Sequence, residues 1–287
     1  MNELGHQAYR VATDQSASLP ARVAAVRVVG RSNAKAVGRV LIELLKPEQS
    51  TDLQAAAVKA LAELNDAALS ASAVAGWEQY SRATRQRLVA AAPRTGALAD
   101  ALLTASEQGK IQLIEVDPST RQALQRNSNP ELKRRAENLF RGAISADREQ
   151  VVQNFKPAVQ MNGNRKHGAE IFAKTCLRCH AMQGEGARVG PDLSVIATPP
   201  RETMLMNILD PSRQVLPDFL SYTVATVDGE TSTGLITAES ATSVTIRRPD
   251  VTDVTIQRDQ IKELKADGKS LMPDGLEAGL TVQDMAD

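Results

Sequence analysis

A short pattern of basic, small and apolar positions recurs along the first half of the chain. It occupies residues 21–30, returns 32 residues later at 53–61, and returns again at 85–90. A degenerate fourth copy lies at 131–139, and helix-like segments such as 36–45 separate the copies. Paired helices that repeat at this period predict an α-solenoid, in which each repeat packs on its neighbours.

The composition of this region also favours helices. Residues 1–142 contain 28 Ala and only five Pro, and Ala has the highest helix propensity. The small Ala side chain also lets neighbouring helices approach closely. The repeats resemble HEAT repeats, although their period is shorter than is usual for that family, and a plain Ala-rich bundle is the alternative. We expect the helical region to span residues 1–148, with Trp77 filling its core.

A second pattern begins after residue 216. Val, Ile and Thr make up 18 of the 51 residues in 216–266, and these residues favour strands. Polar and apolar positions alternate along the first segment, and an Asp-Gly pair then supplies a tight hairpin turn. The expected strands are 219–227, 233–238, 242–247, 251–257 and 260–264. Five short antiparallel strands predict a small SH3-like β-barrel, inserted at residues 217–265.

Between these two regions the pattern is less regular. We expect residues 150–164 to connect the modules, and a short helix to follow over residues 165–175. A second short helix over residues 201–209 follows Pro199 and Pro200, since proline suits a first helical turn, where its missing N–H is not needed.

The charge balance limits the partners of the chain. The 287 residues include 34 Lys and Arg and 34 Asp and Glu, so the formal net charge is zero. A neutral chain argues against non-specific binding of nucleic acid or of an anionic membrane, because both favour basic surfaces. The strand-rich region also lacks a repeated aromatic platform, which argues against nucleic-acid binding there. No apolar run is long enough to span a membrane.

Both cysteines of the chain lie in one pentapeptide, C-x-x-C-H, at residues 176–180. This pattern is typical of the covalent attachment of c-type haem. Cys176 and Cys179 are three residues apart, so on a helical turn their sulfur atoms face the same side and can bond the two vinyl groups of one porphyrin. His180 then follows as the proximal ligand of the iron. The sequence therefore predicts one covalently bound haem c per chain.

Two other interpretations of the pentapeptide are weaker. A thioredoxin-like dithiol is expected in a βαβ setting, which this sequence does not show. A structural zinc site needs four ligands, and the chain has no second Cys/His pair.

The surroundings of the pentapeptide resemble those of class I cytochromes c. A glycine-containing segment, 184–193, follows it and ends in Gly-Pro-Asp-Leu. In that family a prolyl carbonyl accepts the N–H of the proximal histidine. The resemblance therefore implies that Pro191 orients His180 and that Leu193 packs on the porphyrin. Orientation by such an acceptor is usual for a metal-bound histidine.

A longer resemblance covers slightly under half of the chain. Gly-Pro-Asp-Leu at 190–193, Asn-Ile-Leu-Asp-Pro-Ser-Arg at 207–213, the strands that follow, and Ser-Leu-Met-Pro-Asp-Gly-Leu at 270–276 carry it. Together they resemble the haem-binding C-terminal domain of large exported proteins of the planctomycete and verrucomicrobial type. Members of that family often carry a β-propeller, a dehydrogenase-like region and HEAT repeats upstream. The expected fold is therefore mainly α, with a cytochrome c fold over residues 149–287 that the small β-barrel interrupts.

The resemblance also implies the second axial ligand of the iron. It places a distal methionine at Met272, in a loop between the barrel and the last helix, where Pro273 follows it. The alternatives are Met204 and Met206, in a short helix where a packing role is expected, and His167 as a second imidazole.

The sequence departs from this family at both ends. No propeller precedes the repeats, and the family's last helix, which packs near Gly168 and Phe172, is not expected within residues 280–287. Residues 1–20 show no secretory signal, whereas the family's haem attachment takes place outside the cytoplasm. We therefore expect a periplasmic or otherwise exported protein of which this chain is a fragment.

These observations predict an electron-transfer module with a helical repeat region for protein docking. An iron held by His and Met has no open coordination site, and this ligation raises its potential, which suits an acceptor of electrons from a partner dehydrogenase. We expect the chain to act as a carrier within a larger oxidoreductase system rather than as a catalyst. The alternatives are a haem enzyme or gas sensor with an open distal face, and a protein-binding scaffold.

Overall fold

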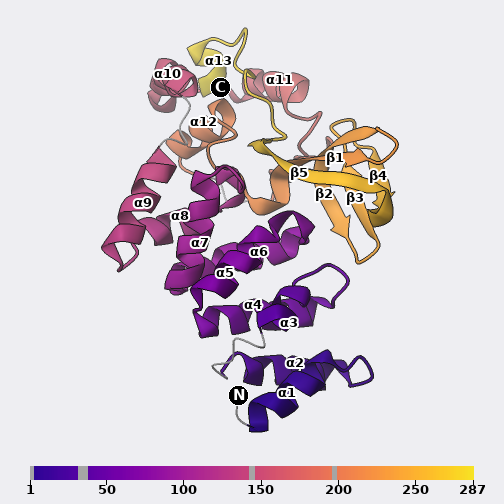
Figure 1. The fold of residues 1–287 in the computed structure, drawn as a ribbon. Helices are drawn as coiled ribbons and strands as arrows, with labels where there is room; N and C mark the ends of the chain where they lie inside the picture. The colour runs from indigo at the N-terminus through magenta and orange to yellow at the C-terminus, as the bar shows by residue number, and fades with distance from the viewer. Residues whose placement is uncertain (1–2, 32–37, 142–145, 196–198) are drawn as a thin grey trace. The chain divides into compact units, whose positions relative to one another are not determined.

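The chain forms two compact units (Figure 1). The computed structural model describes residues 3–31, 38–141, 146–195 and 199–287. The two units are Met1–Phe140 with Glu239–Ser243, and Arg141–Ala238 with Val244–Asp287. They divide at Phe140, a few residues before the division that the sequence predicts at residue 148. No helix in the described part of the chain combines the length and the apolar character needed to cross a bilayer.

The first unit is built from helices, in agreement with its Ala-rich composition. These helices are α1 (Glu3–Thr13), α2 (Leu19–Val29), α3 (Gly38–Glu43), α4 (Thr51–Leu64), α5 (Ala67–Ala75), α6 (Arg82–Ala91), α7 (Gly96–Glu107), α8 (Pro118–Gln125) and α9 (Pro130–Arg141). The four copies of the sequence pattern fall in α2, α4, α6 and α9. Polar caps set several of the helix starts: the side chains of Ser50, Asp66 and Ser81 each accept an N–H from the first turn that follows.

Successive copies of the repeat pack on one another. Helix α2 contacts α4 and α4 contacts α6, while α3 contacts α5 and α5 contacts α7. Small residues make the close approach possible, because a Cβ placed on Gly30 would lie 2.7 Å from the Cα atom of Ala60. The end of α2 therefore rests directly on the backbone of α4.

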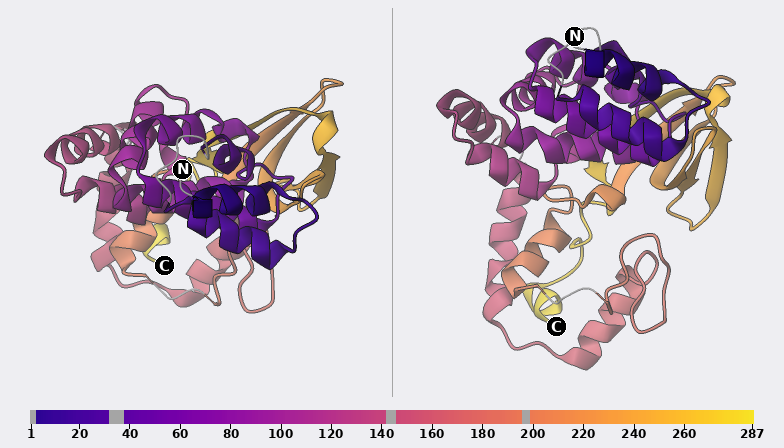
Figure 2. Two further views of the ribbon diagram at one scale, coloured as in Figure 1. Left: turned by 60° about the horizontal axis from the view of Figure 1, so that its bottom comes forward. Right: turned by 90° about the horizontal axis from the view of Figure 1, so that it is seen from below.

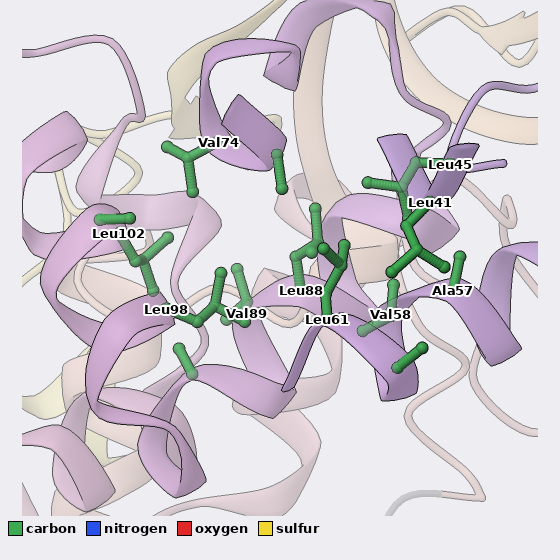
Figure 3. Packing of buried hydrophobic residues seen from close by; sticks show 14 of the residues in the cluster. Leu41, Leu45, Ala57, Val58, Leu61, Val74, Leu88, Val89, Leu98 and Leu102 are labelled. Carbon is green, nitrogen blue, oxygen red and sulfur yellow. The ribbon is translucent and has the colours of Figure 1, made fainter. Parts of the chain in front are cut away.

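One apolar core fills this unit. All members of the buried cluster lie between Ala8 and Phe140, and most are Ala, Leu and Val. Figure 3 shows part of it, with Leu61 of α4, Leu88 of α6 and Leu98 of α7. A fully buried Leu side chain stabilises a fold by about 1.5–3 kcal/mol relative to an exposed one. The first unit thus has its own source of stability.

A buried ion pair lies beside this core. Trp77 is 3% exposed, as its expected core position requires, and its indole Nε1 donates to Glu115 Oε1 at 3.0 Å. Nη1 of Arg85 lies 3.3 Å from the same oxygen, and the guanidinium also donates to two backbone carbonyls. The second carboxylate oxygen accepts the N–H of Gln112 at 3.1 Å. Every charged atom of the pair thus has a partner within the fold.

The second unit combines short helices with one sheet (Figure 2). Its elements are α10 (Ala146–Phe155), α11 (Arg165–Thr175), α12 (Arg201–Leu209), α13 (Val282–Ala286), β1 (Leu220–Thr226), β2 (Thr231–Glu239), β3 (Ser243–Arg247), β4 (Asp253–Gln257) and β5 (Ile261–Ser270). Helices α11 and α12 have the bounds that the sequence predicts. The strands also occur where the alternating pattern predicts them, although β5 continues well beyond residue 264.

The five strands form one antiparallel sheet in the order β4-β3-β2-β1-β5. Ser221 of β1 pairs with Leu235 of β2, and Tyr222 pairs with Ala266 of β5 on the other side. A 3₁₀ turn, Arg258–Gln260, joins β4 to β5. Because β1 pairs with β5, the segments that enter and leave the sheet lie on neighbouring strands.

Two features of this unit go beyond the sequence expectations. The predicted connector is helical over much of its length, since α10 runs to Phe155 and a 3₁₀ helix continues over Lys156–Gln160, where Ala158 is buried. Helix α10 contacts α12, which is distant in sequence. A short helix, α13, lies within the last eight residues and packs on α11, and a Cβ at Gly168 would overlap the backbone of Asp287.

Candidate functional site

The pentapeptide closes the end of α11. Cys176 is the C-terminal cap of this helix, and its N–H donates to the carbonyl of Phe172 at 2.8 Å. The N–H groups of Cys179 and His180 both donate to the Cys176 carbonyl, at 3.0 and 2.9 Å. Both thiols are free and half-buried. A single backbone turn thus carries two thiols and an imidazole, as the spacing of the motif predicts.

The imidazole of His180 has one defined tautomer. Its Nδ1 atom lies 2.9 Å from the carbonyl oxygen of Pro191. A carbonyl oxygen can only accept a hydrogen bond, so Nδ1 carries a hydrogen. Nε2 is therefore the ring nitrogen through which this histidine could bind a metal.

The loop after the pentapeptide folds back over it. The N–H of Gly190 donates to the Cys179 carbonyl at 2.7 Å, and the N–H of Leu193 donates to the Ala181 carbonyl at 2.8 Å. These two bonds flank Pro191 and fix the position of its carbonyl. The backbone of Leu193 thereby lies beside the pentapeptide, and its side chain is half-buried.

Glycine is required at position 190 for reasons of space. A Cβ atom there would overlap Cε1 of His180 and lie 2.7 Å from Nδ1. Because Gly190 directly precedes Pro191, the absence of a side chain lets the backbone come close enough for the Pro191 carbonyl to reach the ring.

Half-buried apolar residues lie on the segments that carry the thiols and Pro191. Ile171 and Phe172 of α11, Leu177 within the pentapeptide, and Leu193 are all half-buried. None of the residues of α11, all of which the structure describes, is fully buried. Partly exposed apolar side chains that are grouped in this way offer surface to another apolar body. Two thiols, one oriented imidazole and this apolar surface are what a covalently attached porphyrin needs, so the residues fit a haem c.

The thiol of Cys176 is partly buried. Burial raises its pKa, and the neighbouring Cys179 raises it further.

Met272 lies in the turn that follows β5 and is half-buried. Its N–H donates to the side-chain oxygen of Ser270 at 3.2 Å, and the N–H of Ser270 donates to Ser212 Oγ at 3.1 Å. These bonds tie the Met272 segment to the turn after α12. The other two methionines considered as ligands lie on α12 itself, where Met204 is 38% exposed and Met206 is half-buried.

His167 has partners of a different kind. Its Nδ1 lies 2.7 Å from Asp287 Oδ2 and 3.7 Å from Asp284 Oδ1. The other oxygen of each carboxylate accepts a backbone N–H, from Asn164 and from Thr281. These three side chains are close enough to hold a metal ion, but each already has a protein partner. We therefore interpret the group as an ion-pair network that joins α11 to α13.

Two arginines near the site have no signal in the sequence. Arg247 of β3 donates from Nη1 to the carbonyl of Arg188 at 3.1 Å, in the loop that carries Pro191. Arg148 of α10 pairs with Glu277, which lies 129 residues away in the chain. No local pattern could predict such contacts, because each joins segments that only the tertiary fold brings together.

A comparison with known families identifies part of the site. Residues 166–216 match the family model of cytochrome c. The matched segment begins in α11, contains the whole pentapeptide and Pro191, and ends after α12. The match supports a cytochrome c-like haem-binding domain in this part of the chain. A search of curated proteins gives no match.

Proposed function

We propose that the chain is a mono-haem c-type cytochrome module that carries electrons from a partner dehydrogenase. The observation that carries this proposal is the hydrogen bond from His180 to the Pro191 carbonyl, on the same turn as two free cysteines. The cytochrome c match at residues 166–216 supports an electron-transfer role.

Each residue of the site has a defined part in this proposal. The thiols of Cys176 and Cys179 would hold the haem, each by adding across one vinyl group, with the sulfur bonding one carbon and the hydrogen passing to the other. His180 would bind the iron through Nε2, while the Pro191 carbonyl holds the ring in one orientation. Leu193 would pack on the porphyrin, and Met272 would bind the iron as its second protein ligand.

The bound haem supplies one-electron exchange between ferric and ferrous iron. With His180 and Met272 both bound to the iron, no position would be open to a substrate, so the haem would exchange single electrons with partner proteins without any bond breaking. A thioether ligand favours ferrous iron and raises the potential, which suits an acceptor for a dehydrogenase.

The remaining parts of the chain are assigned to location and docking. Because c-type haem is attached outside the cytoplasm in the family that the sequence resembles, we place the protein in the periplasm or another exported location. The pairwise contacts of α2 with α4 and of α4 with α6 support a HEAT-like repeat region that docks a partner protein. The strand order and the 3₁₀ turn before β5 support an SH3-like barrel.

An absorption spectrum tests the proposal. The full chain is produced together with a c-type maturation system, and its ferric and ferrous spectra are recorded. We expect six-coordinate, low-spin iron with the weak sulfur-to-iron absorption of ferric Met ligation, and a reversible one-electron titration. High-spin iron with a vacant position would favour a haem enzyme or a gas sensor instead.

A variant then assigns the distal ligand. Met272→Ala should lose the sulfur-to-iron absorption and lower the potential. Retention of both properties would transfer the ligand to Met204 or Met206.

A further inference from the structure

The side chain of Arg148 makes hydrogen bonds to two segments that are distant in the sequence. Its Nε donates to the carbonyl of Leu209 at 2.6 Å, and Nη2 donates to the same oxygen. Nη1 and Nη2 also contact the two carboxylate oxygens of Glu277, at 2.9 and 3.0 Å. The side chains of Arg148 and Glu277 are only 15% and 13% exposed. A bidentate pair of this kind, shielded from water, fixes geometry as well as charge.

These bonds join three segments that are far apart in the sequence. Arg148 lies on α10, Leu209 is the last residue of α12 before the sheet, and Glu277 follows the sheet. A second connection lies close by, where the N–H of Ser270 donates to Ser212 Oγ at 3.1 Å. The chain from Ser270 to Glu277 is therefore held at both of its ends.

Met272 lies within this doubly held segment. Its own N–H is bonded to Ser270 Oγ, so the backbone of the residue is fixed near the first connection. Glu277 provides the second connection, and without Arg148 that end of the segment would lose both of its charge-assisted hydrogen bonds.

The charges around Arg148 make its removal costly. Asp210 is 5% exposed, and its Oδ2 finds no hydrogen-bond partner among the residues that the structure describes. Burial raises the pKa of Asp210, while the positive charges of Arg213 and Arg148 act in the opposite direction. Removing Arg148 would leave the Glu277 carboxylate without its cation and Asp210 with one positive charge fewer, so we expect the segment to move towards solvent.

We propose that Arg148 is a positioning residue that holds the Met272 segment in place, so that Met272 remains bound to the iron. This inference rests on the proposed function and adds to it a residue that contacts neither the haem nor its ligands. It also gives α10 a role in the redox site, because α10 is the element that supplies the arginine.

The test compares four haem-loaded proteins: the wild type, Arg148→Ala, Arg148→Lys and Glu277→Gln. We expect Arg148→Ala and Glu277→Gln to lose most of the sulfur-to-iron absorption and to lower the midpoint potential, with covalent haem content unchanged. Arg148→Lys keeps the charge but not the bidentate geometry, so it should restore the absorption only in part. Gln150→Ala is the control, because Gln150 is exposed on the same helix as Arg148 and bonds within that helix, to Asn154.

The outcomes separate this inference from the proposed function. A wild-type absorption that persists in both Arg148→Ala and Glu277→Gln, at an unchanged potential, overturns the inference alone. A wild type that carries covalent haem without the sulfur absorption overturns Met272 ligation and the inference with it, while haem attachment stands. A wild type without covalent haem overturns the proposed function and the inference together. If Arg148→Ala does not fold, Glu277→Gln decides, since it removes only the charge of the partner.

Discussion

The carbonyl of Pro191 determines which nitrogen of His180 is available to a metal. The two residues are eleven positions apart, and the contact exists because the intervening loop returns to the ring. The sequence resemblance implies that Pro191 orients the histidine, and the observed 2.9 Å distance provides the geometry that such a role needs. The part that Gly190 plays becomes visible only in the structure.

Replacing Gly190 with Ala tests this arrangement. The new Cβ would overlap the His180 ring, so the ring must move away from the Pro191 carbonyl. Overpacking of this kind costs about 1–3 kcal/mol. We expect a several-fold lower yield of haem-loaded protein and a larger high-spin fraction in its absorption spectrum. Gly96→Ala is the control, because a Cβ there meets no described atom within 4 Å. Equal haem loading of the two variants would contradict the role of Gly190.

The buried pair of Arg85 and Glu115 gives a second prediction at this scale. Glu115→Ala leaves Arg85 buried without its counter-ion and removes the acceptor of the Trp77 N–H. Breaking a buried pair in this way costs about 3–5 kcal/mol. Trp77 is the only Trp of the chain, so its fluorescence during urea denaturation reports this unit directly.

The control for this measurement replaces both members of the pair with apolar residues. Arg85→Met combined with Glu115→Leu should lose less stability than Glu115→Ala, because no uncompensated charge remains and only the Trp77 and Gln112 N–H groups lose their acceptor. A loss below about 1 kcal/mol for Glu115→Ala, the range of a surface pair, would show that the pair is unimportant.

At the scale of elements, the contact between α11 and α13 should depend on pH. The hydrogen bond with Asp287 raises the pKa of His167 from its ordinary 6.5. Protonated His167 therefore stabilises the folded state fully below about pH 6.5, and this stabilisation is lost as pH rises through the raised pKa. The backbone N–H of Asn164, followed by His167, lowers the pKa of Asp287 to about 2. Ionised Asp287 stabilises the folded state above the ordinary pKa of an aspartate, near 4, and this stabilisation is lost as pH falls towards 2. The contact should therefore be most stable between about pH 4 and 6.5.

The measurement is the difference in free energy of unfolding between the wild type and His167→Ala as a function of pH. The groups that face His167 are Asp284, Asp287 and Glu170. We expect the difference to be largest near pH 5 and to vanish at alkaline pH, whereas His6→Ala on α1 should leave the profile unchanged. A difference that grows with rising pH would contradict the ion-pair interpretation.

The elements differ in how far the sequence could predict them. Helices α11 and α12 carry local signals, with a polar cap at Asn164 and prolines before Arg201, and their bounds are predicted correctly. The strands carry an alternating pattern and are also predicted. Helix α10 was expected to be part of a connector, because its stability comes from contacts with α12 and from the pairing of Arg148, which the local sequence does not contain.

At the scale of the whole molecule, the first unit should fold without the second. Its buried cluster contains only residues between Ala8 and Phe140. We expect a fragment of residues 1–141 to be helical and to melt cooperatively when followed by circular dichroism. Leu61→Ala should lower its stability by about 2–5 kcal/mol, as expected for a truncated core residue. A gradual, non-cooperative melt of the unmodified fragment would contradict the division into units.

The limits of sequence-based reasoning are clearest at this scale. The pentapeptide is a local motif and identifies its chemistry from five residues. Two hydrogen bonds near the site depend on the tertiary fold. One joins Arg148 to Glu277 across 129 positions, and the other joins Arg247 to the Arg188 carbonyl across 59 positions. The motif therefore predicts what the site binds, and the structure adds how the surrounding segments are held.

Mass spectrometry of the denatured protein tests the central claim most directly. The chain is produced with a c-type maturation system, denatured, and weighed alongside the double variant Cys176→Ala/Cys179→Ala. We predict that the wild type carries the mass of one haem through two thioether bonds, and that the double variant carries none. An unmodified wild-type mass, from cells that mature a control cytochrome c normally, would contradict the assignment of residues 176–180 as a haem attachment site.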